Sequence, residues 1–337
     1  MRFWSKSELK QFLIEETAYE PRGKASLKVE VNKENAPLWE FKCKSRHAAG
    51  QISVLPQNDE LRKSVIRSLD RIGATELSIT NIWDKKTRKT NQDNWEDWFL
   101  SNFVSPNLSK PIYLVPDTNF IMRRYASGLL RRMGEEKFKL LRFEIPNFVI
   151  LEIEAKYNRE KKKSENKKCK SDERQAALMK KGETLIATKE LLFLIDKGAQ
   201  NLSSDMDEKI FSQFAKTAGR GFADSFIRNE IRTSFLTGTH VFLTCDLMNA
   251  LAATAEGIST LYFSRSDSEI GRLSSEHDMC MEQLSELIVD TAFVFGEITL
   301  AESLSSGKQK IMKFGGSWDS WGLPDLFDDK IAQLDSP

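Results

Sequence analysis

The sequence predicts an α/β protein: a central parallel sheet with helices on both faces, plus an additional α+β region at the N-terminus. From residue 111 to about 265, short apolar runs alternate with helix-like segments, which is typical of βαβ units. The runs are nearly continuous in apolar residues, as expected for strands buried on both faces. Residues 1–108 instead mix strand-like runs with one clear helix. The chain has 337 residues, 40% of them apolar, enough for more than one domain core.

We expect three regions along the chain. Residues 1–108 form an α+β accessory or recognition domain, with a helix at 59–71 and a strand at 79–83. A polar, turn-rich stretch at 101–111 separates it from the α/β domain at 109–265, which carries a basic helical insertion at about 156–200. Residues 266–337 form a C-terminal extension with a helix from 275 to about 295 and an acidic tail.

Within the α/β region each element has a local reason. Pro146 suits the first turn of a helix, and Gly257 suits the end of one. The expected strands are 111–116, 240–245 and 258–263, and the expected helices are 119–142, 146–158, 184–197, 205–216, 222–236 and 247–256.

Composition excludes several classes of protein. The net charge is only +1, so the charge of the whole chain does not by itself indicate nucleic-acid binding, although residues 156–184 carry 11 Lys or Arg against 5 Asp or Glu. Four scattered cysteines without a C-x-x-C pair, and three histidines, argue against zinc and against a disulfide framework. The apolar runs are shorter than the ~20 residues that cross a bilayer, and the N-terminus lacks an apolar signal core. We therefore expect a cytoplasmic protein without a membrane partner.

Four acidic residues occupy positions that suit one site. Asp117 and Asp246 each follow an apolar strand, and the carboxyl ends of strands are where α/β sheets build sites. Glu152 shares a helix face with Val149, whereas Glu154 is turned about 200° away. Asp224 lies in the first turn of its helix. Because grouped carboxylates repel one another, such a cluster predicts a bound Mg²⁺ or Mn²⁺.

Each acid also has a structural interpretation. Asp117 and Asp246 suit helix N-caps, Glu152 suits an exposed helix face, and Asp224 suits the positive end of a helix dipole. The short polar side chains nearby suit turns and caps, or they orient the carboxylates and a water molecule. These side chains are Thr118, Asn119, Thr244 and Asn249.

The order of these pieces resembles the PIN-domain nucleases over residues 111–265. The matching segments are Leu114-Val-Pro-Asp117-Thr-Asn119, Pro146-Asn-Phe-Val-Ile-Leu-Glu152, Ala223-Asp224-Ser-Phe-Ile227, Leu243-Thr-Cys-Asp246, and the small-residue helix with its Gly-Ile turn at Ala250–Ile258. The resemblance implies that Asp117, Glu152, Asp224 and Asp246 are catalytic and bind the metal. The long, lysine-rich gap between Glu152 and Asp224, and the position of Asn249 one place further along than usual, depart from the family pattern.

The function implied by the resemblance is metal-dependent hydrolysis of phosphodiester bonds, as an endoribonuclease on single-stranded RNA. DNA remains an alternative substrate. Basic side chains that would attract the nucleic-acid backbone are Arg123, Arg124, Lys161, Lys162, Lys163, Lys167 and Lys168. The alternatives are an inactive PIN-like module that binds RNA or a protein as a scaffold, and a toxin-like RNase controlled by a partner. A homo-oligomer and a regulatory protein partner both stay open.

Overall fold

The computed structural model describes the chain in segments: residues 2–4, 8, 10–11, 26–31, 36–43, 49–56, 58–74, 78–81, 111–128, 141–202, 223–264, 277–303, 309–315 and 331–333. The fold is α/β, as the sequence predicts. It divides into two compact units. Unit 1 comprises residues 1–75, 160–186 and 267–337, and unit 2 comprises residues 76–159 and 187–266. Among the helices of the described segments, none is both long enough and apolar enough to cross a membrane.

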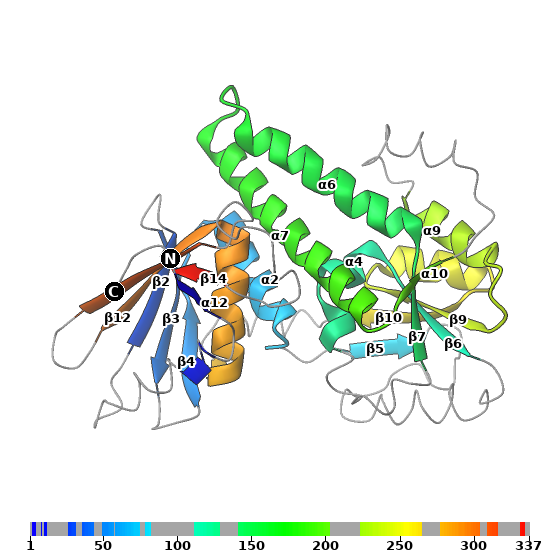
Figure 1. The fold of residues 1–337 in the computed structure, drawn as a ribbon, viewed down its shortest axis with the longest axis horizontal. Helices are drawn as coiled ribbons and strands as arrows, with labels where there is room; N and C mark the ends of the chain where they lie inside the picture. Colours follow the sequence, from blue (N-terminus) through cyan, green and yellow to red (C-terminus); the bar gives the residue numbers. More distant parts are fainter. Residues whose placement is uncertain are drawn as a thin grey trace. The chain divides into compact units, whose positions relative to one another are not determined.

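Unit 2 is built on a mainly parallel sheet (Figure 1). Its described strands are β5 (Ser78–Asn81), β6 (Ile112–Pro116), β7 (Leu141–Ile145), β8 (Gln200–Asn201), β9 (Thr239–Thr244) and β10 (Ser259–Ser264), in the order β5-β10-β9-β6-β7-β8. The five strands from β10 to β8 are parallel, and β5 pairs antiparallel with β10. The predicted parallel sheet is confirmed.

The strand order reverses between β6 and β9. From β6 the chain moves through β7 to β8 on one side, whereas from β9 it moves to β10 on the other. Because parallel crossovers are right-handed, connections that run in opposite directions cover opposite faces of the sheet. The carboxyl ends of β6 and β9 therefore form a topological switch point, the place where open α/β sheets hold ligands.

Among the described helices that contribute to unit 2, α9 and α10 lie close to the predicted positions and three others differ from them. The helices are α4 (Thr118–Met122), α6 (Asn147–Glu165), α7 (Ser171–Asp196), α9 (Ala223–Arg232) and α10 (Leu247–Ala255). The helix predicted at 119–142 is wrong at its end, since α4 stops at Met122 and residues 141–142 belong to the strand β7. Helices α6 and α7 are longer than predicted and continue through the basic segment into residues assigned to unit 1. The helix predicted at 205–216 lies outside the described residues. Gly257 ends α10 with a φ of 80°, a conformation that glycine adopts without strain.

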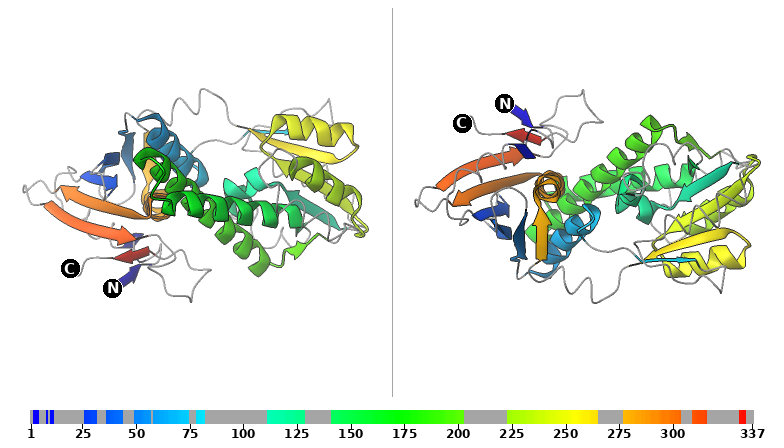
Figure 2. Two further views of the ribbon diagram at one scale, coloured as in Figure 1. Left: turned by 90° about the horizontal axis from the view of Figure 1, so that it is seen from above. Right: turned by 90° about the horizontal axis from the view of Figure 1, so that it is seen from below.

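Unit 1 contains an antiparallel sheet with helices on one face, as the two views of Figure 2 show. Its helices among the described residues include α2 (Asp59–Arg71), α12 (Met281–Phe295) and the part of α7 up to Ile186. Its eight described strands, in sheet order, are β1 (Arg2–Trp4), β14 (Ile331–Gln333), β13 (Gln309–Gly315), β12 (Glu297–Ser303), β2 (Ser26–Val31), β3 (Ala36–Cys43), β4 (Ala49–Val54) and β11 (His277–Cys280). Strands from the two ends of the chain thus share one sheet.

This arrangement differs from the predicted boundaries at 108 and 265. The residues predicted as an N-terminal domain and as a C-terminal extension contribute to one hydrophobic core, in which Val29 and Trp39 pack with Leu287 and Ile298. Conversely, β5 belongs to the sheet of unit 2. The sequence hides these connections because antiparallel pairing over long sequence separations leaves no local signal.

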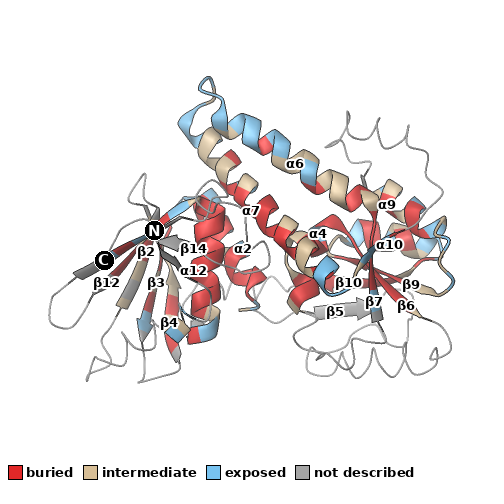
Figure 3. Ribbon diagram, in the orientation of Figure 1, coloured by how far each residue is buried: buried red, intermediate tan, exposed pale blue. Residues whose placement is uncertain are grey.

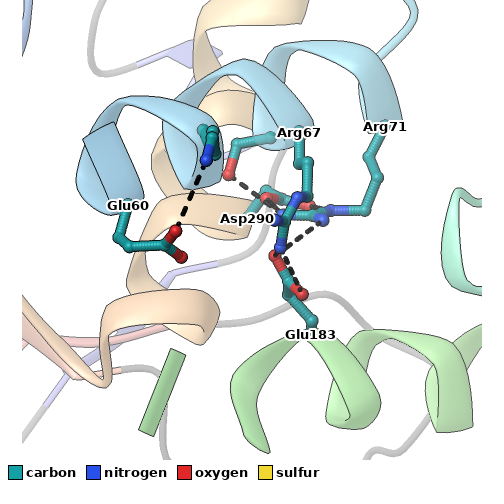
Figure 4. Close-up of polar contacts among 7 residues, drawn as sticks. Glu60, Arg67, Arg71, Glu183 and Asp290 are labelled. Carbon is teal, nitrogen blue, oxygen red and sulfur yellow. Dashed lines mark hydrogen bonds and ion pairs between the residues drawn. The ribbon is translucent and has the colours of Figure 1, made fainter. Parts of the chain in front are cut away.

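Ion pairs connect α2, α7 and α12 within unit 1, and the pair between Arg71 and Asp290 is buried (Figure 4). The guanidinium group of Arg71 donates to both carboxylate oxygens of Asp290 at 2.8 and 2.7 Å, and Arg67 donates to Glu183 at 2.9 and 3.1 Å. Arg71 and Asp290 have side-chain exposures of 3% and 0%. Figure 3 shows how α12 is buried along its length, whereas the far end of α6 is exposed.

Candidate active site

Asp117 and Asp246 lie at the ends of the neighbouring strands β6 and β9. The two strands are in register with Pro116 opposite Leu243, and the backbone N–H of Asp117 donates to the carbonyl of Leu243 at 2.9 Å. Both aspartates are N-caps: Asp117 caps α4 by accepting from Phe120 N at 2.6 Å, and Asp246 caps α10. Capping and site formation are compatible, because each cap fixes the carboxylate at the sheet edge.

Asp117 is the most deeply buried of the four acids. It is 1% exposed, and its second oxygen accepts a short hydrogen bond from the hydroxyl of Thr244. Burial raises the pKa of Asp117 to about 7, against the stabilising hydrogen bonds from Thr244 and Phe120, and the negative charges of Asp224 and Glu152 add to the rise. A carboxyl group with this pKa changes its charge near neutral pH.

Glu152 projects from the second turn of α6 and has a partner on each oxygen. Its Oε2 accepts from the hydroxyl of Thr118 at 2.5 Å, and its Oε1 lies 2.9 Å from the ammonium nitrogen of Lys156. Its side chain is 17% exposed, so Glu152 is not a freely solvated surface charge. Glu154, on the opposite side of the helix, is exposed, as the helical spacing predicts.

Asp224 completes the group from the first turn of α9. Burial raises its pKa, and the charges of Glu152 and Asp246 raise it further, while Arg228 and Lys156 lower it. Asp224 thus interacts electrostatically with Glu152 and Asp246, and Asp117 interacts with Glu152 and Asp224. The four predicted acids belong to one electrostatically connected group.

Glu230 fixes the two helices that carry Glu152 and Asp224. From α9, its carboxylate accepts hydrogen bonds from the backbone N–H groups of Asn147 and Phe148, both at 3.1 Å, at the first turn of α6. It also accepts from the side-chain amide of Asn147 at 3.0 Å. A carboxylate at this position satisfies free N–H groups and interacts favourably with the helix dipole. Glu230 is fully buried, and burial raises its pKa.

The predicted supporting residues occupy different positions. Thr118 and Thr244 each hold a carboxylate, and Thr244 also accepts from Asp246 N at 3.0 Å. Asn249 is buried on α10, where its Oδ1 accepts from Arg228 at 2.6 Å. The side chain of Asn119 is exposed at the start of α4.

The predicted nucleic-acid contacts also differ among themselves. Arg124 pairs with the fully buried Glu190 at 3.5 Å and is 14% exposed, which gives it a structural role. Arg123 is half-buried, with its guanidinium group 6.0 Å from the ring centre of Tyr125. The five lysines of the basic segment are all exposed: Lys161, Lys162, Lys163, Lys167 and Lys168.

Sequence reasoning missed Lys156, Arg228 and Glu230 as site residues. A usable signal existed for the first two, because each stands four residues after one of the acids, where a basic side chain reaches an acidic one on a helix. Arg228 links α9 to α10 through Asn249 and through Glu256 at 2.9 Å. Glu230 carries no such signal, since its partner helix lies more than 80 residues away in sequence.

The donor set fits a hard divalent cation in its chemistry, because it consists of carboxylate and hydroxyl oxygens. Burial raises the pKa values of Asp117 and Asp224, and the negative charges of neighbouring carboxylates raise them further. In the described segments, however, no three acidic, histidine or cysteine side chains lie close enough together to hold one metal ion. Binding would therefore require the carboxylates to move closer together.

Comparison with known proteins gives no further assignment: no family model, curated protein or solved structure matches this chain.

Proposed function

We propose that this protein is a metal-dependent nuclease that hydrolyses phosphodiester bonds, acting as an endoribonuclease on single-stranded RNA. The observation that carries the proposal is the convergence of Asp117, Glu152, Asp224 and Asp246 on one electrostatic group at the strand-order reversal. These acids come from four separate segments, in the order that resembles the PIN-domain nucleases.

The chain's own residues would hold Mg²⁺ or Mn²⁺ through these four carboxylates. When bound, such an ion supplies positive charge that activates water and stabilises negative charge on the phosphodiester. Thr244 and Thr118 orient the carboxylates of Asp117 and Glu152 through their hydroxyl groups. Because Asp117 has a pKa of about 7, it must give up its proton before it can act as a ligand, so cation binding would strengthen as the pH rises through neutrality.

The choice of RNA over DNA follows the resemblance, and the five exposed lysines of the basic segment supply positive charge for a phosphate backbone. None of the described cysteines Cys169, Cys245 and Cys280 forms a disulfide bond. We place the protein in the cytoplasm, where thiols stay reduced.

The direct test is incubation of the full chain with end-labelled single-stranded RNA and DNA of one sequence, each with Mn²⁺, Mg²⁺ or EDTA. We expect internal cleavage of RNA with either cation and none in EDTA. Cleavage that persists in EDTA, or no cleavage with any cation, would refute the proposal.

One observation favours a second candidate, a catalytically inactive module that binds RNA as a scaffold. The described acids do not form a preassembled metal group. For such a module the same assay would show RNA bound without cleavage, and the affinity for RNA would not change when EDTA replaces Mn²⁺.

A further inference from the structure

Among the described residues, the four acids make one ion pair, which joins Glu152 to Lys156. Lys156 follows Glu152 by one helical turn, and its ammonium nitrogen lies 2.9 Å from Glu152 Oε1. The same nitrogen lies 3.8 Å from the sulfur of Met122 at the end of α4. The Lys156 side chain is only 25% exposed, so the ammonium group is held between α6 and α4 rather than extended into solvent.

The second basic residue near the acids, Arg228, makes its hydrogen bonds to residues other than the four acids. The guanidinium group of Arg228 donates to Asn249 and Glu256, and none of the four acids receives a described hydrogen bond from it. Lys156 therefore provides direct charge compensation to the group, at Glu152, and its charge also acts on Asp224. Thr118 holds the other oxygen of Glu152.

A divalent cation that uses Glu152 Oε1 as a ligand meets the ammonium group at the same oxygen. When both contact that oxygen, the two cations repel one another, so each weakens the binding of the other. The divalent cation therefore binds there more tightly once the ammonium group has left Glu152. The free energy needed to break the ion pair makes the free energy of cation binding less favourable, so the measured affinity for the cation is lower.

We propose that Lys156 is a positioning residue that competes with the divalent cation for Glu152 and thereby sets the cation affinity of the site. This inference rests on the proposed function, since it requires that the four acids bind a cation. It adds a role for a residue outside the acidic group: Lys156 holds Glu152 until a cation replaces it.

The test measures Mn²⁺ affinity by calorimetry on the full chain without nucleic acid. Lys156→Met keeps an unbranched side chain beside Met122 but removes the charge, and we expect its Mn²⁺ dissociation constant to fall about fivefold. Lys156→Arg keeps the charge and should bind as wild type does. Lys162→Met, the same change of charge at an exposed position of α6, is the matched control and should also leave the affinity unchanged.

A double-mutant cycle separates competition at Glu152 from a general effect of charge. In the Glu152→Gln background, Lys156→Met should change the logarithm of the Mn²⁺ dissociation constant by less than half of the change that it causes in the wild-type background. Melting supplies an independent measurement: in EDTA, Lys156→Met should melt below wild type, yet Mn²⁺ should raise its midpoint by more than it raises that of wild type. Lys156→Gln serves in the same measurements if the Met variant does not fold.

Unchanged or weaker Mn²⁺ binding in the Lys156→Met and Lys156→Gln variants, with wild type binding normally, would overturn this inference alone. An equal gain in Lys162→Met would also overturn it, because the effect would then be a general one. If wild type binds no Mn²⁺, the proposed function fails, and the competition fails with it.

Discussion

At the scale of single residues, two of the four carboxylates of the site, Asp117 and Asp224, are held where burial raises their pKa. Asp117 shows this most clearly: its hydrogen bonds from Thr244 and Phe120 favour the charged form, yet burial outweighs them and raises its pKa to about 7. The same hydrogen bonds fix the direction of the carboxylate. Asp117 is therefore well oriented but incompletely charged at neutral pH.

The raised pKa predicts how Asp117→Asn changes stability with pH. Between about pH 4 and 7 the folded protein binds the Asp117 proton and the unfolded chain does not, so wild-type stability falls as the pH rises through this window. Asparagine does not titrate. From pH 5 to pH 8 in EDTA, the melting midpoint of Asp117→Asn should therefore rise relative to that of wild type. The corresponding gain in the free energy of unfolding is a few kcal/mol, at about 1.4 kcal/mol per pKa unit.

Scanning calorimetry at several pH values in this range measures the difference. Asp196→Asn makes the same change of charge at an exposed position and should show no comparable trend. If the difference in melting midpoint between Asp117→Asn and wild type stays constant from pH 5 to 8, Asp117 is charged throughout this range and burial does not raise its pKa.

At the scale of elements, helix ends and ion pairs fix the geometry. Glu230 on α9 caps α6, and Arg228 on α9 binds Asn249 on α10, so three helices that carry acids of the site are connected by polar contacts. In unit 1 the Arg71–Asp290 pair joins α2 to α12 in the same way. When one partner of a buried ion pair is removed, the other charge stays buried without compensation, which destabilises the fold.

Removal of one partner from the buried pair should therefore be costly. Asp290→Asn removes the carboxylate that pairs with the buried guanidinium group of Arg71, and the ion pair of Arg71 with Glu183 that remains is longer, at 3.9 Å. The substitution should lower the free energy of unfolding by about 3–5 kcal/mol. Glu60→Gln removes the exposed 3.5 Å pair with Lys63 on the same helix α2 and should cost less than about 1 kcal/mol. Urea denaturation of the full chain compares the two, and equal losses would contradict this account.

Much of the site's framework could be predicted from sequence, because it depends on local patterns. An apolar strand followed by an aspartate and then a helix predicts the placement of Asp117 and Asp246, and helical spacing distinguishes Glu152 from the exposed Glu154. What escaped prediction depends on contacts distant in sequence. Capping of α6 by Glu230 and pairing of β5 with β10 are examples.

The length of α7 escaped prediction for a different reason. Its residues Met179 and Ile186 pack in the core of unit 1, whereas Leu191 and Leu194 pack in the core of unit 2. A helix that supplies two cores carries apolar residues on changing faces along its length, so a single amphipathic pattern does not span it.

At the scale of the whole molecule, each unit is assembled from separate segments of the chain. The site lies in unit 2, whereas the five exposed lysines lie in the segment assigned to unit 1. The proposed catalysis and the proposed attraction of RNA are therefore assigned to different parts of the chain. They can be separated experimentally.

Replacing the five lysines of the basic segment with glutamine should weaken binding of single-stranded RNA without removing the acids. The slope of log affinity against log salt should become shallower by up to ~0.7 for each phosphate that the protein no longer neutralises. Fluorescence anisotropy in EDTA measures binding without turnover. The control replaces five lysines elsewhere in unit 1: Lys10, Lys28, Lys42, Lys63 and Lys313. Equal slopes in wild type and in the basic-segment variant would show that these lysines do not bind the RNA.

In the proposed function, the acids at the ends of β6 and β9 and on α6 and α9 perform metal-dependent cleavage. The most direct measurement is the single-turnover rate of RNA cleavage with Mn²⁺ for Glu152→Gln against Glu154→Gln, two identical changes on one helix, each checked for native folding by circular dichroism. We predict that Glu152→Gln lowers the rate by about 100-fold or more, and that Glu154→Gln retains the wild-type rate. Equal rates in the two variants would contradict the account and place the chemistry elsewhere.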